Sequence, residues 1–230
     1  MTLHRFFVDP GAVSGDRFPL PASIEHQVRT VLRLRDGERI VLLPGDGDEL
    51  ICRLEDGSCA VESRHPAGGE PAHRLTVIQA LLKGDGLDEV VQRATELGAA
   101  RFALTVTDRC VAREVSPRKL ERLRTIARES AEQSERGIVP EVDAPVPLAA
   151  LLQPPAVLLF ERELDHRLRD LADAPTVVVI GPEGGFSERE VALARERGVE
   201  VVGLGHRILR SSTVAPAVAA VVLSRTGDFA

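Results

Sequence analysis

The chain has 230 residues, of which 43% are hydrophobic and 28% charged, a balance typical of a globular protein with one large domain or two modest ones. With no Trp, no Tyr and 7 Phe, it cannot hold single-stranded nucleic acid mainly by aromatic stacking. The formal net charge of −6 argues against a general nucleic-acid coat protein, which needs clustered Lys and Arg.

The cysteines and the ends of the chain restrict the class of protein further. Cys52, Cys59 and Cys110 are odd in number and match no metal-binding spacing, and the His residues are scattered. The opening MTLHRFFVDP lacks the apolar core of a signal peptide, and the longest apolar run near the C-terminus is too short to span a bilayer. We therefore expect a cytoplasmic protein in a reducing compartment, with no structural metal and no membrane segment.

The first part of the chain is rich in predicted strands. Residues 22–34 have helical spacing, with Ser23 as a possible cap, and precede three strand-like runs at 38–43, 49–54 and 58–63. PGDGD and EDG turns separate these runs. The pattern predicts a small barrel or sheet.

After a predicted linker at 65–73, rich in Pro and Gly, the pattern changes to alternating strands and helices. Apolar runs predict strands at 75–82, 101–107, 156–160, 176–180 and 199–204. Helices are predicted at 86–100, at 116–137 with Ser116 as cap and Gly137 as stop, and after each of the last three strands. This order predicts a mainly parallel sheet covered on both faces, with ligands beyond the carboxyl ends of the strands. The turns at 160–163, 181–187 and 204–213 are the ones to inspect.

The turn at 181–187, GPEGGFS, begins where a predicted strand ends. Ser187 and Glu190 form a capping box that starts a helix at once. The glycines would let a flat ligand press against backbone, while Glu183 would repel pyrophosphate and tolerate a neutral or cationic ligand. The turn lacks the Walker Lys and the G-x-G-x-x-G spacing. A plain strand-to-helix connection, with glycines used only for tight turning, remains the alternative.

The turn at 204–213, LGHRILRSST, carries two large apolar residues. Ile208 and Leu209 are costly to expose, so they should cover either core or the faces of an apolar ring. Arg207 and Arg210 lie on either side of them. Together with the glycine turn, this turn can form a pocket for a purine-bearing cofactor. A core anchor flanked by solvent-facing Arg is the other interpretation.

Several segments, taken in order, carry a family resemblance. They are RFFV, HQVRTVLRL and GERIVLLPGDG, followed by KGDGLDEVVQRATELG, TDRCVAR, IARESAEQSERGIVPEV, VVIGPEGGFSERE and LGHRILR. In this order and spacing they resemble the RsmE family of ribosomal RNA uracil-N3 methyltransferases, which belongs to the SPOUT superfamily. The resemblance implies an α/β fold, with an N-terminal PUA-like RNA-binding β-barrel at 1–70 and a C-terminal SPOUT methyltransferase domain with a trefoil knot at 74–230.

The resemblance also implies a chemistry. It implies S-adenosyl-L-methionine as cofactor and, as acceptor, N3 of a specific uridine near the 3′ end of 16S rRNA in the small ribosomal subunit, with the enzyme acting as a homodimer. The positions that match the family's cofactor site are Leu159, Phe160, Gly181, Pro182, Glu183, Gly184, Gly185, Leu204, Gly205, Ile208, Leu209, Arg210 and Thr213.

Catalytic candidates follow from the chemistry of uracil. N3 must lose a proton, and an Arg can stabilise the negative charge that spreads to the flanking carbonyl oxygens. Arg210 ranks first, and Arg109 and Arg136 lie in the family-like segments; a structural ion pair is the alternative role for Arg210. Glu132 or Glu183 can accept the proton, although Glu132 can instead anchor a neighbouring Arg.

The basic residues suggest RNA contacts. Between Arg109 and Arg128 there are seven basic residues and two acidic ones, which fits either a solvated helix face or contact with RNA. The target uridine must be unpaired or displaced, and an assembled small subunit could present it by shape. The expected phosphate contacts, each of which can equally serve solubility, are Arg5, Arg29, Arg33, Arg35, Lys83, Arg93, Arg113, Arg118 and Lys119.

Two departures from the family pattern leave rival functions open. Ser212 stands where the family's R-x-E-T-A has an acid, although Ser212 can still cap the last helix, and Glu135 replaces the glycine of EQSGR. One rival is a ribosome-binding module that has lost its cofactor. The other is a nucleotide-dependent oxidoreductase, but the glycine turn at 83–86 lacks the G-x-G-x-x-G spacing.

Overall fold

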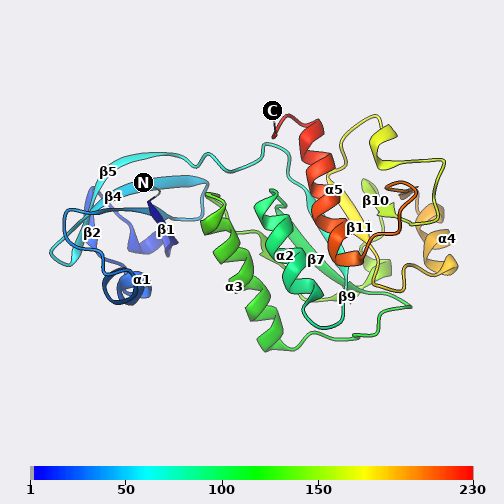
Figure 1. Cartoon of the computed structure of the whole chain (residues 1–230), viewed down its shortest axis with the longest axis horizontal. Helices are drawn as coiled ribbons and strands as arrows, with labels where there is room; N and C mark the ends of the chain where they lie inside the picture. The colour runs from blue at the N-terminus through cyan, green and yellow to red at the C-terminus, as the bar shows by residue number, and fades with distance from the viewer. Residues whose placement is uncertain (1–2, 230) are drawn as a thin grey trace. The chain divides into compact units, whose positions relative to one another are not determined.

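The computed structural model describes residues 3–229 and divides into two compact units. The first contains the chain up to Glu70 together with Ala131–Val139, and the second contains Pro71–Ser130 with the chain from Pro140 onward. Figure 1 traces both units along the chain. The first crossing between units, at Glu70, falls inside the predicted linker. Because Ala131–Val139 returns to the first unit, each unit is formed by two separate stretches of the chain.

The first unit is built on a five-stranded mixed sheet. Its strands are β1 (His4–Phe7), β2 (Arg17–Pro19), β3 (Arg39–Leu43), β4 (Asp48–Glu55) and β5 (Ser58–Pro66), in the order β1-β3-β4-β5-β2. The β1–β3 pair is parallel, and the other pairs are antiparallel. The three predicted strands are confirmed, whereas β1 and β2 were not predicted because they have too few residues to show alternation.

A short helical segment precedes the predicted strands. After the 3₁₀ turn η1 (Pro10–Ala12), helix α1 (Ala22–His26) continues into the π-helical turn η2 (Gln27–Val31). The predicted helix at 22–34 is thus present but shorter. Ser23 is not its cap, since Pro21 occupies that position and makes no side-chain hydrogen bond.

Apolar packing explains why Ala131–Val139 belongs to the first unit. Phe7, Val41 and Leu43 form a buried cluster with Ala131, and Val139 packs against it. The backbone N–H of Phe7 also donates a hydrogen bond of 2.8 Å to Glu132 Oε1. The segment therefore completes the core beside β1 and β3.

The second unit contains the predicted parallel sheet. Its strands are β6 (Thr76–Ala80), β7 (Arg101–Val106), β8 (Glu141–Val142), β9 (Val146–Pro147), β10 (Ala156–Leu159), β11 (Val177–Ile180) and β12 (Glu200–Val202). The order is β12-β10-β11-β6-β7-β8, with β9 also beside β7, and every pair is parallel. The five strands predicted for this part of the chain are confirmed.

Helices pack against both faces of this sheet. They are α2 (Gly86–Glu96), α3 (Pro117–Gln133), α4 (Glu188–Glu196) and α5 (Ser211–Arg225), with 3₁₀ turns η3 (Leu148–Ala150) and η4 (Leu168–Asp170). Ile78, Val179 and Leu158 stand side by side across three strands and share a buried cluster with Val191 and Ala194 of α4. Figure 1 shows α5 alongside α2, and these two helices are in contact.

The prediction of a helix after every late strand is wrong for β10. The chain after β10 forms only the short turn η4, because it pairs with the end of β12 instead. The N–H of Gly203 donates to His166 O at 2.9 Å, and the N–H of Leu168 donates to Gly203 O at 3.0 Å. A Cβ at Gly203 would lie 1.8 Å from the carbonyl oxygen of Glu163, so only glycine fits this crossing.

The length and hydrophobicity of the helices bear on membrane insertion. Within residues 3–229, no helix is both long and apolar enough to cross a membrane.

Candidate functional site

A cavity of about 660 Å³ lies beyond the carboxyl ends of β6, β10, β11 and β12. Its volume falls within the range of about 300–1,000 Å³ that is usual for small-molecule sites. Three loops supply most of its wall, namely 160–162 after β10, 181–186 after β11 (the first loop) and 204–212 after β12 (the second loop). Leu82 and Gly86 add a contribution from the turn after β6. The three turns singled out in the sequence therefore converge.

The cavity contains nearly all the positions that the sequence assigned to the cofactor. Every one of them lines it except Thr213, which lies exposed on α5. Arg207, expected beside the apolar pair, also lines the cavity. Sequence reasoning assigned no cofactor contact to the other lining residues, which are Leu82, Gly86, Glu161, Arg162, Ile180, Phe186, Ser211, Ser212 and Val214. The turn containing Glu161 and Arg162 had been singled out, but no pattern distinguished those two side chains.

Glycines in the first loop are required by close packing. Gly185 has φ +67°, and a Cβ there would lie 2.8 Å from Glu161 Oε1. A Cβ at Gly184 would lie 3.1 Å from Arg109 Cβ. The loop ends in the predicted capping box of Ser187 and Glu190, which the structure confirms at the start of α4. The loop is thus fixed at both its turn and its helix end.

Contacts from neighbouring loops hold the first loop in place. Glu183 Oε1 accepts a hydrogen bond of 2.9 Å from the N–H of Lys83 in the turn after β6. Arg109, in the turn after β7, donates to the carbonyl oxygen of Gly184 at 3.1 Å. The two charged side chains therefore help to shape the backbone of the loop.

Asp108 joins the turn after β7 to the start of α4. Its carboxylate accepts hydrogen bonds from Arg189 Nη2 and Ser187 Oγ, each 2.6 Å long. Its own N–H donates to Glu190 Oε1 at 2.8 Å. The hydrogen bonds from Arg189 and then Ser187 hold the pKa of the Asp108 carboxyl below its usual value. Asp108 is therefore an ionised brace beside the first loop.

The second loop presents an apolar shelf to the cavity. Ile208 is 84% exposed, which excludes the core-anchor interpretation for this residue, and both Ile208 and Leu209 line the cavity. Gly205 has φ +134°, and a Cβ there would meet no atom within 4 Å, so the glycine serves the backbone conformation. Ile208 and Leu209 therefore offer apolar surface to a ligand in the cavity.

A buried polar chain connects the two loops. Gln79 Nε2 on β6 donates to Ser211 Oγ at 3.1 Å, and Ser211 Oγ donates to the carbonyl oxygen of Gly181 at 2.5 Å. Helix α5 begins at Ser211 with Arg210 as its N-cap and no side-chain capping bond. The prediction that Ser212 caps this helix is therefore wrong. The cap position comes two residues earlier, and Ser212 instead lines the cavity in the first turn.

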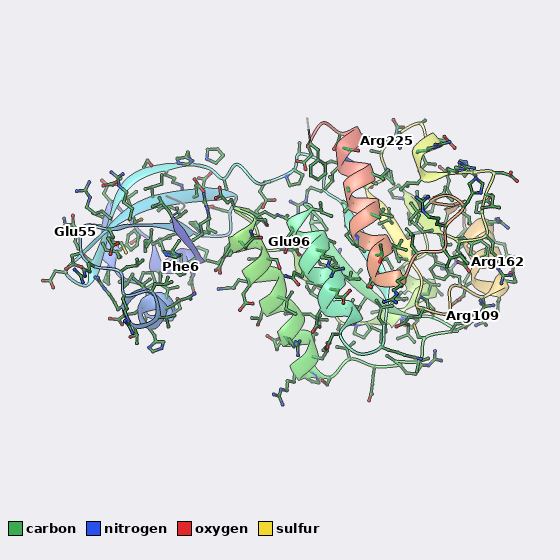
Figure 2. All side chains as sticks on the ribbon, viewed as in Figure 1. Phe6, Glu55, Glu96, Arg109, Arg162 and Arg225 are labelled. Carbon is green, nitrogen blue, oxygen red and sulfur yellow. The ribbon has the colours of Figure 1, made fainter. Side chains whose placement is uncertain are left out.

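Charges of both signs surround the cavity. Arg162, Arg207 and Arg210 line it together with Glu161 and Glu183. Figure 2 labels Arg162, whose guanidinium lies 3.7 Å from Glu188 of α4, and Arg109 beside the first loop. Such a site suits a ligand with an apolar ring and separate polar or charged ends.

The four catalytic candidates fall in different surroundings. Arg210 lines the cavity, and Arg109 contacts the first loop. Arg136 belongs to the first unit, where its side chain is 2% exposed and contacts both carboxylate oxygens of Glu70 at 3.2 and 3.1 Å. Glu132 is in the same segment and accepts a hydrogen bond from the N–H of Phe7. Arg210 thus lines the cavity itself, and Arg109 lies outside the cavity wall, against the first loop.

Acidic partners neutralise several of the expected RNA contacts. Arg5 is largely buried and pairs with Glu49 and Glu135. Four others also have polar partners: Arg29 with Asp36, Arg93 with Glu89, Arg113 with the carbonyl oxygen of Thr107, and Lys119 with Asp88 and Asp85. Arg33, Arg35, Lys83 and Arg118 are exposed.

Arg122 and Arg124 of α3, which were not among the expected RNA contacts, also have acidic partners. Arg122 Nη2 lies 2.6 Å from Asp88 Oδ2, and Arg124 contacts Glu121. Much of the positive charge of the 109–128 stretch is therefore compensated within the second unit.

Comparison with known proteins identifies the family. Residues 69–223 match the model of the RNA methyltransferase domain. The chain is 33% identical to Ribosomal RNA small subunit methyltransferase E of Synechocystis, over 94% of this chain and 75% of the relative. It is 31% identical to the protein of the same name from Bacillus subtilis, over 85% of each chain.

Solved structures agree with this assignment. Ribosomal RNA small subunit methyltransferase E from Neisseria gonorrhoeae, bound to S-adenosyl methionine, has a TM-score of 0.87 at 29% identity, over 97% of this chain and 98% of that one. A structure from Legionella pneumophila with the bound cofactor SAM has a TM-score of 0.81 at 26% identity, over 98% of this chain and 97% of that one. With its parallel sheet, its converging loops and these relatives, the chain belongs to the RsmE family of small-subunit ribosomal RNA methyltransferases.

Proposed function

We propose that this protein transfers the methyl group of S-adenosylmethionine to N3 of a uridine near the 3′ end of 16S rRNA in the small ribosomal subunit. The observation that carries the proposal is the cavity of about 660 Å³, whose two glycine-containing loops lie beyond a parallel sheet. A solved relative with the same family name contains S-adenosyl methionine. The exposed Ile208 shelf and the mixed charges fit adenosine with a charged tail.

The chain's residues divide the task of binding. Leu159, Phe160, Ile208 and Leu209 supply apolar surface for the adenine ring. The backbone of Gly181–Gly185 supplies polar groups at close range, because no side chain intervenes at the glycines. When bound, the cofactor supplies a methyl group on a positively charged sulfur. Hydrogen bonds from Lys83 to Glu183 and from Ser187 to Asp108 hold the loop in place. The entropy cost of orienting the loop is therefore met before the reaction.

Arg210 is the residue to which we assign charge stabilisation. It lines the cavity at the N-cap of α5, and its guanidinium can donate hydrogen bonds to the uracil carbonyl oxygens as N3 loses its proton. We assign Arg109 a supporting role through its contact with Gly184. For Arg136 and Glu132 the contacts with Glu70 and Phe7 support a role in packing the first unit.

We further propose that the enzyme acts in the cytoplasm on the assembled small subunit. The net charge of −6 and the internal pairing of Arg5, Lys119 and Arg122 leave little free positive charge for long naked RNA. Recognition by shape on a folded particle requires less of it. Strong methylation of a short naked RNA would contradict this part of the proposal.

The finer architecture is also proposed from the family. We propose that the mixed sheet of the first unit is a PUA-like RNA-binding barrel, that the domains correspond to 1–70 and 74–230, and that the protein is a homodimer. A trefoil knot in the second unit is proposed on the same ground.

Nucleoside mass spectrometry of 16S rRNA tests the function. RNA from cells that lack the protein should have lost one 3-methyluridine, and restoring the gene should return it. Unchanged 3-methyluridine in the deletion strain would overturn the proposal.

A further inference from the structure

The acidic residues around the cavity differ in what already holds them. Glu183 accepts a hydrogen bond from the N–H of Lys83. Glu190 is buried in the capping box and also accepts one from Asp108. Glu163 pairs with Arg195 at 3.1 Å. Each of these three carboxylates therefore already has a hydrogen-bond or ion-pair partner within the protein.

Glu161 is different. Its side chain lines the cavity, and both carboxylate oxygens lie against the backbone of Gly185, where a Cβ would come within 2.8 and 3.2 Å of them. Throughout residues 3–229, nothing donates a hydrogen bond to this carboxylate or forms an ion pair with it. The absence of a side chain at Gly185 leaves the space that the carboxylate occupies.

A carboxylate in this state can accept two hydrogen bonds from a ligand. Its place in the wall suggests which group supplies them. Glu161 directly follows Phe160, which belongs to the apolar surface proposed for adenine, and the sugar is the part of a nucleoside attached to the base. A vicinal diol offers two neighbouring donors, and a carboxylate that receives ribose hydroxyls is a recurrent arrangement at the carboxyl edge of parallel sheets.

We propose that Glu161 is a cofactor-specificity residue that accepts hydrogen bonds from the ribose hydroxyls of the methyl donor. This inference rests on the proposed function, because it assumes that the cavity holds S-adenosylmethionine. It adds a residue from the β10 turn to the two glycine-containing loops. It also gives Gly185 a second role beyond its positive φ, which is to admit the carboxylate.

Calorimetry with three ligands tests the assignment. S-Adenosylhomocysteine carries the ribose and the amino-acid tail, 5′-methylthioadenosine carries the ribose without the tail, and 5′-methylthio-2′-deoxyadenosine lacks one hydroxyl. Each is titrated into the wild-type chain, into Glu161→Gln and into the control Glu196→Gln, which removes an exposed carboxylate of α4 that does not line the cavity. Thermal unfolding of each variant verifies that it is folded.

We expect Glu161→Gln to weaken S-adenosylhomocysteine and 5′-methylthioadenosine alike, by about ten-fold, since a hydrogen bond to a charged group is lost. Loss of the 2′-hydroxyl should weaken binding to the wild type and have little effect on Glu161→Gln. Equal affinities in wild type and Glu161→Gln would overturn the inference and leave the proposed function standing. Weakening of S-adenosylhomocysteine alone would also overturn it, because the carboxylate would then face the amino group. If the wild type bound none of the ligands, the proposed function itself would fail.

Discussion

Ser187 Oγ at the start of α4 lies 2.6 Å from Asp108 Oδ2 in the turn after β7. This bond ties two segments almost eighty positions apart in the sequence, and the first loop lies directly before Ser187. Asp108 and Ser187 do not line the cavity, so the position of the first loop depends on residues outside the cavity wall.

Asp108→Asn should make stability less dependent on pH. The folded pKa of Asp108 lies below the unfolded value of about 3.9, so its stabilisation is present above that value and is lost as the pH falls through the folded pKa. Wild type should melt above Asp108→Asn at pH 7, with the difference shrinking below about pH 3. Thermal unfolding across this range measures it. Asp173→Asn, which changes an exposed carboxylate, should track the wild type at both ends.

Ser211→Ala should loosen the connection between the two loops. The change removes the part-buried hydrogen bond to Gly181 and the buried acceptor for Gln79, which should cost about 1–3 kcal/mol of unfolding free energy. Affinity for S-adenosylmethionine should fall as well. Denaturant unfolding and calorimetry measure the two effects. The comparison is Ser224→Ala, whose exposed hydroxyl bonds only Val221 of its own helix; equal behaviour of the two variants would refute the role of Ser211.

Gly203→Ala should be the most damaging single methyl group in the second unit. Its Cβ would lie 1.8 Å from the backbone oxygen of Glu163, which cannot move without breaking the crossing, so we expect a loss of about 3 kcal/mol or more. Gly68→Ala is the matched control, because a Cβ there meets no atom within 4 Å, and its cost should stay within about 0.5 kcal/mol. Equilibrium unfolding in urea compares them. A Gly203→Ala protein as stable as the control would contradict the described crossing.

Arg210→Ala should separate catalysis from cofactor binding. If its guanidinium stabilises the charge on uracil, turnover should fall by about 100-fold while cofactor affinity changes only a few-fold. Methyl transfer to small subunits and calorimetry are the two measurements. Arg169→Ala removes an exposed guanidinium outside the cavity lining and should leave both values unchanged. Wild-type turnover in Arg210→Ala would remove Arg210 from the mechanism.

Much of the second unit can be predicted from sequence because its signals are local. Continuous apolar runs such as 176–180 give buried parallel strands, and Ser187 with Glu190 gives a helix start, which the structure confirms. The family resemblance, which comparison with relatives confirms, added the cofactor that no periodicity encodes. The convergence of three turns followed from the parallel order.

One wrong prediction and two features that no local pattern indicates depend on long-range contacts. No helix follows β10 because that chain pairs with Gly203, some forty residues later. The segment Ala131–Val139 joins the first unit because Ala131 packs against Phe7 and Leu43. Glu161 escaped notice because a single acid after a strand has no pattern. The surroundings of Glu161 are defined by Gly185 and the cavity, which only the fold brings next to it.

A crystal structure obtained with S-adenosylmethionine tests the central claim most directly. The account predicts the cofactor in the cavity, with its adenine against Phe160 and Ile208 and its methyl group open to the side of Arg210. A structure in which saturating cofactor leaves this cavity empty, or binds at another place, would contradict it.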